Sequence, residues 1–325
     1  MKVLFMGTPD FAVPTLEALV KSEHEVVSVV TQPDKPKGRG KEIQFTPVKE
    51  CAVKYNIPVL QPVKVKEEAF LDELTKIDFD TIVVVAFGQI LPKRLLDMPK
   101  YGCINVHSSL LPAYRGAAPI QWAVVYGETK SGVTTMFMDE GLDTGDILLQ
   151  KEIELDKEET GGSLHYKLSV IGADLLIETL KEIENGTVKR IKQDESKSNY
   201  VGMIDKKTGA IDFNEDAVVI ERLIRGLNPW PSAFAKLDNK TIKIWKANVI
   251  TLDDLKDMNF TQMSDNIEKM ENGTVVAVSK DSFVVKTGRD FLECIEVQLE
   301  GKKRMDASDF LRGYKLETGN MLVKP

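Results

Sequence analysis

The chain has 325 residues and a mass of 36.3 kDa, a length that predicts about two domains. Hydrophobic residues make up 42% of it and charged residues 29%, as in soluble globular proteins, which excludes disorder or collagen-like repeats as overall descriptions. The net charge of −7 lies in the first 205 residues, because residues 206–325 carry equal numbers of acidic and basic side chains. A strongly basic nucleic-acid-binding protein is thereby excluded. The three scattered cysteines form no CxxC pair, which argues against disulfides and zinc fingers and predicts a cytoplasmic protein.

The first half of the chain alternates short apolar runs with amphipathic segments. Strands are predicted at residues 2–6, 26–31, 81–87, 102–106 and 133–138. Helices are predicted over 11–21, where apolar residues recur at helical spacing, and over 117–126, with Pro119 near the first turn and Gly127 just past the end. This alternation predicts a Rossmann-like α/β domain with a doubly wound, mostly parallel sheet.

A long helix is predicted from Ser163 to the Asn185-Gly186 pair that ends it. The polar residues 189–207 predict a linker between a catalytic domain, residues 1–188, and a second domain, residues 208–325. In the second domain, short strands are predicted at residues 233–237, 241–247, 273–278, 282–286 and 292–297. Strands of this length, separated by Asn, Asp and Gly turns, predict a smaller β-barrel or sandwich. Residues 253–271, with six acids and two lysines, are expected to form an exposed acidic insertion.

Several familiar motifs are incomplete. Gly7-Thr8-Pro9-Asp10 follows the first strand, where a dinucleotide-binding fold carries GxGxxG, but the second and third glycines are absent. Asp143-Thr144-Gly145 matches the aspartic-protease triplet, but no second triplet supplies the partner carboxylate. His24, His107 and His165 have no spacing that makes a ligand pair, so no metal is expected.

Polar residues follow two of the predicted strands. Asn105 and His107 alternate around Val106, so both side chains point to one face of the strand at 102–106. The strand at 133–138 runs into an acidic loop that contains Asp143. Ligands of open α/β sheets bind outside the carboxyl ends of the strands. Each of these residues alone could merely satisfy backbone hydrogen-bonding groups of a turn, but together they indicate a ligand-binding or catalytic site.

These side chains suit transfer of an acyl group to an amine. The Asn105 amide and the His107 imidazole can donate to an oxygen that becomes negative. Asp143 can fix the tautomer of His107 and stabilise its protonated form. No nucleophilic side chain is needed, so the acyl group would pass directly to the substrate amine.

The motifs around these residues resemble those of the 10-formyltetrahydrofolate-dependent formyltransferases, and the resemblance covers essentially the whole chain. The shared motifs are Asn105-Val106-His107, Ser109-Leu110-Leu111-Pro112, Arg115-Gly116-Ala117-Ala118-Pro119-Ile120 and Leu142-Asp143-Thr144-Gly145-Asp146. Agreement with the subgroup that acts on methionyl-tRNA comes from Gly7-Thr8-Pro9-Asp10-Phe11-Ala12, the segment from Thr31 to Lys41, and Asn228-Pro229-Trp230-Pro231.

The resemblance implies that Asn105, His107 and Asp143 are catalytic. It implies 10-formyltetrahydrofolate as the formyl donor, with folate contacts from Ser109, Leu110, Leu111, Pro112, Ile90 and Leu91. It also implies that the second domain is an OB-like barrel that helps to hold tRNA.

Residues 33–49 form a basic segment, with five basic and two acidic side chains. Its prolines and glycines predict an irregular loop rather than a helix or strand. The residues expected to contact tRNA phosphates are Lys35, Lys37, Arg39 and Lys41. The alternative is a solvated surface loop with no binding role.

We therefore expect a monomeric, cytoplasmic enzyme that transfers a formyl group from 10-formyltetrahydrofolate to the α-amino group of initiator methionyl-tRNA. One alternative is the same chemistry on a small amine, such as glycinamide ribonucleotide or an amino-sugar nucleotide; the second domain and the basic loop argue against it. The other is a non-enzymatic RNA-binding protein, against which the complete trio of Asn105, His107 and Asp143 argues.

Overall fold

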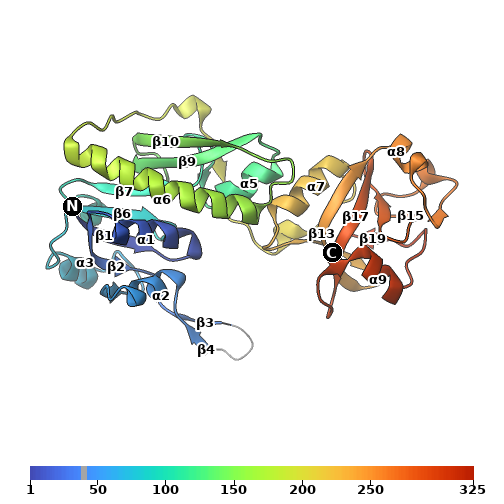
Figure 1. Cartoon of the computed structure of the whole chain (residues 1–325), viewed down its shortest axis with the longest axis horizontal. Coiled ribbons are helices and arrows are strands. Elements are labelled where there is room, and N and C mark those ends of the chain that lie inside the picture. Colours follow the sequence, from blue (N-terminus) through green and yellow to red (C-terminus); the bar gives the residue numbers. More distant parts are fainter. Residues whose placement is uncertain (38–41) are drawn as a thin grey trace. The chain divides into compact units, whose positions relative to one another are not determined.

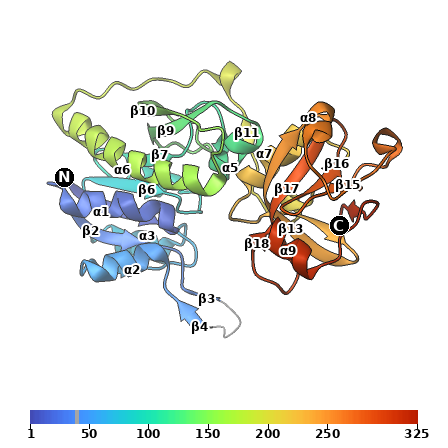
Figure 2. The same cartoon turned by 45° about the vertical axis from the view of Figure 1, so that its right-hand side comes forward.

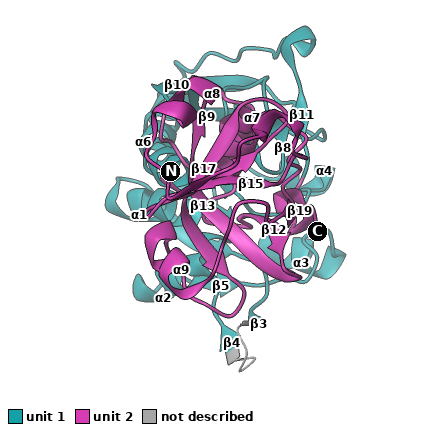
Figure 3. Cartoon of the chain, turned by 90° about the vertical axis from the view of Figure 1, so that its right-hand side faces the viewer, with its two compact units in different colours: residues 1–119, 130–155, 164–202 teal, residues 120–129, 156–163, 203–325 magenta. Residues whose placement is uncertain are grey.

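The computed structural model describes residues 1–37 and 42–325 (Figure 1). The chain divides into two compact units, coloured separately in Figure 3. Unit 1 comprises residues 1–119, 130–155 and 164–202, and unit 2 comprises residues 120–129, 156–163 and 203–325. Among the described residues, no helix combines the length and the apolar character needed to cross a membrane.

Unit 1 is built on a seven-stranded sheet with the order β10-β9-β7-β6-β1-β2-β5. Its strands are β1 (Lys2–Gly7), β2 (Glu25–Val30), β5 (Val59–Leu60), β6 (Thr81–Val85), β7 (Cys103–His107), β9 (Lys130–Phe137) and β10 (Ile147–Glu154). The first five of these are mutually parallel, whereas β9 runs antiparallel to β7 and β10 antiparallel to β9. The predicted α/β domain with a mostly parallel sheet is confirmed. The strands β5 and β10 were not expected from the sequence.

Helices cover the sheet of unit 1. They are α1 (Val13–Lys21), α2 (Pro47–Lys54), α3 (Glu68–Leu74), α4 (Lys93–Leu96) and most of α6 (Gly161–Asn185). The helices α1 and α6 lie side by side over one face (Figure 1, Figure 2). Where α6 crosses β7 and β9, the glycine at position 172 leaves room for the side chains of Val106 and Val133. This close packing supports β7, the strand that carries the predicted site.

The basic segment is partly regular. Lys35–Lys37 (β3) pairs antiparallel with Glu42–Gln44 (β4), so the prediction of an irregular loop throughout residues 33–49 is wrong at these positions. Pro36 lies in β3 because an isolated two-stranded hairpin has a free edge, where a missing N–H breaks no ladder. Lys49 lies in α2, and its ammonium group pairs with Asp34.

Unit 2 contains an antiparallel sheet with the order β14-β15-β16-β17-β13-β12-β19, and β18 pairs with β17. The strands are β12 (Ala233–Leu237), β13 (Lys240–Ile250), β14 (Gln262–Met263), β15 (Val275–Val278), β16 (Phe283–Lys286), β17 (Phe291–Leu299), β18 (Met305–Asp306) and β19 (Leu322–Val323). The helices are α5 (Pro119–Val125), α7 (Ala217–Gly226), α8 (Leu252–Asp257) and α9 (Ala307–Gly313). A bridge between Thr274 and Met321 joins the β15 and β19 sides, so the sheet curls into the expected OB-like barrel.

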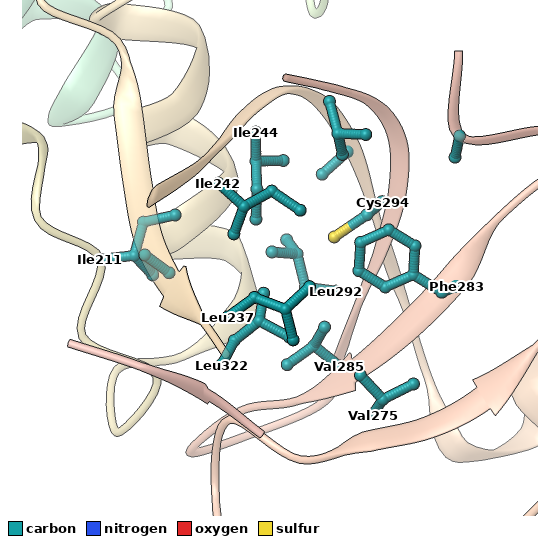
Figure 4. Packing of buried hydrophobic residues seen from close by; sticks show 14 of the residues in the cluster. Ile211, Leu237, Ile242, Ile244, Val275, Phe283, Val285, Leu292, Cys294 and Leu322 are labelled. Atoms are coloured by element: carbon teal, nitrogen blue, oxygen red, sulfur yellow. The ribbon is translucent and has the colours of Figure 1, made fainter. Parts of the chain in front are cut away.

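The core of unit 2 forms inside this curled sheet. Ile242 and Ile244 from β13, Leu292 from β17 and Phe283 from β16 point toward one another (Figure 4). All four are at most 1% exposed. The predicted alternation of buried and less buried residues is confirmed in β12 and β13. It is wrong for β15 and β16, which are buried on both faces because a second apolar cluster covers the outer one.

The acidic insertion, residues 253–271, is folded. Its six acidic side chains are exposed, as expected. However, Leu255 and Ile267 are buried and pack with Val276 and Phe291 in a second apolar cluster of unit 2. The insertion is therefore anchored to the barrel, because apolar residues at two points along it have a surface to cover.

Candidate active site

The strand β7 presents the first two predicted catalytic residues. Asn105 and His107 are 9% and 7% exposed, and they lie on the same face of β7 because they are two residues apart. The N–H₂ group of an asparagine side chain is a donor, so Asn105 can donate to an oxygen of a ligand.

The imidazole of His107 lies between two groups. Its Nε2 is 3.0 Å from the backbone oxygen of Tyr114. Since a carbonyl oxygen can only accept, this contact places the proton of the neutral ring on Nε2. On the other side, Nδ1 is 3.7 Å from Oδ1 of Asp143. The three predicted catalytic residues belong to unit 1, and Asp143 lies near His107 as expected. Selection of the His107 tautomer, which was expected of Asp143, is instead made by the backbone carbonyl of Tyr114.

Asp143 reaches His107 by a different path from the one expected. Because β9 is antiparallel to β7, its last residue, Phe137, lies opposite Ile104, while His107 lies opposite Thr134. The carboxyl ends of the two strands are therefore at opposite edges, and the expectation that both residues follow strand ends at one edge is wrong. The loop between β9 and β10 returns along the sheet and brings Asp143 back to His107.

The loop is held in a strained conformation. Asp143 has a φ of 56°, in the left-handed region that non-glycine residues rarely adopt. Its Oδ2 accepts a hydrogen bond of 2.8 Å from the backbone N–H of Gly116. A Cβ at Gly145 would lie 1.7 Å from the backbone oxygen of Phe137, so only glycine allows the loop to approach the end of β9 so closely. This explains physically why the motif has glycine at that position.

The segment Ser109–Pro112, predicted to lie along folate, is fixed by a buried hydroxyl. Thr134 Oγ1 donates to the backbone oxygen of Ser109 at 2.7 Å and accepts from the N–H of Leu111 at 3.1 Å. Gln150 donates to the backbone oxygen of Leu111 at 2.9 Å. The side chain of Leu111 packs into a small core with Met136 and Ile147. Leu110 and Pro112 remain partly exposed.

The other two predicted folate residues follow β6. Ile90 is 77% exposed, whereas Leu91 is 3% exposed and belongs to the core of unit 1. Close to them, the backbone oxygen of Phe87 accepts hydrogen bonds of 3.2 Å from Thr8 Oγ1 and from Gln32 Nε2. These bonds tie together the loops that follow β1, β2 and β6 at one edge of the parallel sheet. Neither donor was expected from the sequence.

Of the four predicted tRNA contacts, Lys35 is exposed on β3. Arg39 and Lys41 lie outside the described residues, as does the side chain of Lys37. Within the described residues, one group of side chains has its potential metal-binding atoms within 4.8 Å of one another: Glu23, His24 and Glu184. It lies at the amino-terminal edge of β2 rather than beside Asn105 and His107. This group is not apparent from the sequence, because Glu184 is remote in the chain from Glu23 and His24.

A buried cation also belongs to this region. Arg115 is fully buried, and its guanidinium group donates to both carboxylate oxygens of Glu195, at 2.9 and 2.8 Å. These bonds raise the pKa of Arg115 above its ordinary value. Glu195 belongs to the expected linker, which therefore contacts the site region of unit 1.

Comparison with known proteins identifies the family. The family described as Formyl transferase matches residues 1–180, and the family described as Formyl transferase, C-terminal domain matches residues 203–315. A methionyl-tRNA formyltransferase of Lachnospira eligens is 56% identical, with 99% of each chain covered. The chain belongs to the methionyl-tRNA formyltransferase family. Another member, from Agathobacter rectalis, is 54% identical over 99% of this chain and 100% of its own.

Solved structures share the fold of this family member. A sugar 3N-formyltransferase in the presence of dTDP and 5-N-formyl-THF has a TM-score of 0.64 and 21% identity, covering 93% of this chain and 99% of its own. An N-formyltransferase from Helicobacter canadensis, in complex with folinic acid and dTDP-3-aminofucose, has a TM-score of 0.64 and 20% identity, covering 90% and 98%. At these identities the likeness concerns the fold.

Proposed function

We propose that this family member transfers the formyl group of 10-formyltetrahydrofolate to the α-amino group of methionine esterified to initiator tRNA. The observation that carries the proposal is the grouping of an amide on a buried residue, Asn105, with a buried imidazole, His107, and a carboxylate, Asp143. The full-length identity to methionyl-tRNA formyltransferases supports the same acceptor.

The three side chains divide the chemistry. As the amine adds to the formyl carbon, negative charge develops on the formyl oxygen, and the N–H₂ group of Asn105 donates to that oxygen. The nitrogen of the attacking amine must lose a proton. Because Tyr114 holds the proton of the neutral His107 ring on Nε2, an incoming proton goes to Nδ1, where the Asp143 carboxylate stabilises the imidazolium. When the tetrahedral adduct collapses, the bond from the formyl carbon to N10 of the folate breaks, N10 takes up a proton, and tetrahydrofolate leaves.

The acceptor amine needs little activation. A free α-amino group titrates near a pKa of about 7.7–8.0, and esterification of the neighbouring carboxyl lowers that value further. A large fraction of the nucleophile is therefore neutral at physiological pH. The protein then has to position the amine and stabilise the developing charge.

The folate donor is proposed to lie along Ser109–Pro112, with Ile90 contacting its pterin. The exposed side chain of Ile90 and the partly exposed Leu110 and Pro112 are available for this contact. Leu91 and Leu111 support it from the core, since both are 3% exposed.

The tRNA is proposed to contact the β3–β4 hairpin and unit 2. Unit 1 contributes a net acidic surface, so a polyanion must be held by local basic groups, among them Lys35, Lys37, Arg39 and Lys41. Neutralising all four should raise the KM for tRNA and flatten its salt dependence, because each lost phosphate contact removes about one released counterion. An unchanged KM at low and high salt would show that the hairpin is a surface feature only.

The test of the acceptor compares kcat/KM with a fixed concentration of 10-formyltetrahydrofolate. Initiator methionyl-tRNA, glycinamide ribonucleotide, an amino-sugar nucleotide and free methionine are offered in parallel. Only the tRNA should be a good acceptor. If a small amine is the better acceptor, the formyl transfer chemistry stands and the proposed acceptor is wrong.

The catalytic roles are tested by Asn105→Ala and His107→Ala. Each should lower kcat by about 10²–10³, the loss that follows removal of one group that stabilises developing charge. Activity within tenfold of wild type for both variants would refute the mechanism.

We also propose that the enzyme is a cytoplasmic monomer. Light scattering at micromolar concentration compares its mass with the 36.3 kDa of one chain.

A further inference from the structure

Residues 190–201, here called the 190s segment, run along the loops that flank His107. Ile191 forms an antiparallel bridge with Ile147 at the start of β10. Further along, the strand β11 (Tyr200–Val201) pairs in parallel with β8 (Arg115–Gly116). All of these residues belong to unit 1. A polar segment expected to be a linker is thus bonded at both ends to the region of the site.

Gln193 lies between these two attachments and contacts the loop of Asp143 directly. Its Nε2 donates to the backbone oxygen of Asp143 at 2.8 Å and to that of Gly145 at 2.7 Å. Its Oε1 accepts from Nε and Nη2 of Arg115 at 3.1 and 2.9 Å. Both ends of the amide are therefore satisfied, and the orientation of the side chain is determined by its partners.

The buried guanidinium group fixes this orientation. A guanidinium has donors and no acceptor, so the atom of Gln193 that faces Arg115 must be the oxygen. The N–H₂ group is then directed toward the two loop carbonyls. Glu195, two residues further along, pairs with the same guanidinium and balances its charge.

The other neighbour of His107 is held by the same segment. Asn199 Oδ1 accepts from the backbone N–H of Tyr114, and the backbone oxygen of Asn199 accepts from the N–H of Arg115 at 3.0 Å. Tyr114, like Asp143, has a positive φ, here 59°. Such conformations persist only where surrounding contacts hold them. The 190s segment supplies contacts to both residues whose groups face the imidazole.

We propose that Gln193 is a positioning residue of the formyl transfer reaction, which acts by holding the backbone of Asp143 so that its carboxylate faces His107. This inference rests on the proposed function, because it takes Asp143 to be catalytic. Gln193 does not touch the reacting atoms. Its effect is on the placement of a charged group, so its loss should lower kcat more than it changes either KM.

The test is Gln193→Glu in the full-length enzyme. The substitution keeps the shape of the side chain and an oxygen for Arg115, but it places a carboxylate oxygen against two carbonyl oxygens in place of the donor. We expect kcat for methionyl-tRNA formylation to fall by roughly tenfold to a hundredfold, as for a displaced catalytic group. The KM values for folate and tRNA should stay within about twofold.

The matched control is Asp194→Asn, the neighbouring position. Asp194 accepts from the N–H and hydroxyl of Ser196 and approaches Lys197, and asparagine keeps the cap. This control alters the same segment by one charge without touching Arg115 or the loop. Its kcat should match that of the wild type. A fall equal to that of Gln193→Glu would overturn the specific role of Gln193.

A double-mutant cycle with Asp143→Asn separates positioning from general loss of structure. If Gln193 acts through the Asp143 carboxylate, Gln193→Glu should lower kcat by less than about threefold once that charge is gone. A full multiplicative loss, or a Gln193→Glu enzyme with wild-type kcat, would overturn the proposal. If the wild type does not formylate methionyl-tRNA, the proposed function itself fails. If it does but Asp143→Asn keeps the wild-type kcat, the proposed function stands, and the catalytic role of Asp143 and the positioning role of Gln193 fail.

Discussion

Replacing Thr134 by valine tests how the buried hydroxyl supports the predicted folate segment. Thr134 is 0% exposed, and valine has nearly the same volume, so the change leaves no cavity. It removes the acceptor for the N–H of Leu111 and the donor for the backbone oxygen of Ser109. Gln150 Nε2 loses its hydrogen bond to Thr134 Oγ1 and keeps the one to the backbone oxygen of Leu111.

The expected loss follows from the two backbone groups left without these partners. A buried polar group that loses its hydrogen bond costs about 1–3 kcal/mol. Two such groups lower the free energy of unfolding by about 2–6 kcal/mol. For a domain of 150–250 residues, this corresponds to a fall in Tm of roughly 4–24 °C. The segment that Thr134 holds should also lose its fixed conformation.

The assays are urea unfolding followed by circular dichroism, and the KM for 10-formyltetrahydrofolate. Thr134→Val should lower stability and raise this KM. The matched control is Thr135→Val, one residue along β9 and also 0% exposed. Thr135 Oγ1 contacts Thr179 Oγ1 at 2.8 Å, away from the folate segment, so its loss should destabilise without changing the KM. A Thr134→Val enzyme with wild-type stability, or equal KM values in both variants, would refute the reasoning.

Three further predictions concern burial and charge. Burial raises the pKa of the Cys103 thiol to about 12, so iodoacetamide at pH 8 should label it in urea but not in the native protein; native labelling at the rate of a free thiol would contradict this. Hydrogen bonding to Arg115 holds the pKa of Glu195 below its ordinary 4.5, so the stabilisation is present above the unfolded-state pKa and disappears as pH falls through the folded-state pKa. Urea unfolding from pH 7 to pH 3 should therefore show that the difference in the free energy of unfolding between wild type and Glu195→Gln disappears in acid. A difference that grows as the pH falls would contradict this prediction. Phe283→Ala should lower the free energy of unfolding by about 3–5 kcal/mol, measured against Val249→Ala, at a position 38% exposed, which should change it by about 0.5 kcal/mol or less; equal losses would count against the barrel core.

The spacing of apolar residues along the chain was enough to predict the strands and helices that bury an apolar face. The run at 81–87 became β6, and the long apolar repeat became α6, because burial of a periodic apolar surface is decided by neighbours along the chain. Asn105 and His107 share a face for the same local reason. The strand β10 was missed because its apolar residues are grouped at its start and do not alternate along it, and four of its eight residues are exposed.

Contacts between remote residues could not be predicted in this way. The direction of β9 is a property of the whole sheet, and with it the return of the loop that brings Asp143 to His107. The polar composition of residues 189–207 is the same for a solvated linker and for a segment that bonds to backbone groups. Only folding places Gln193 beside a buried arginine and a loop 50 residues earlier in the chain. Hydrogen-bond partners depend on which groups are excluded from water together, and that is settled by tertiary packing rather than by the order of residues.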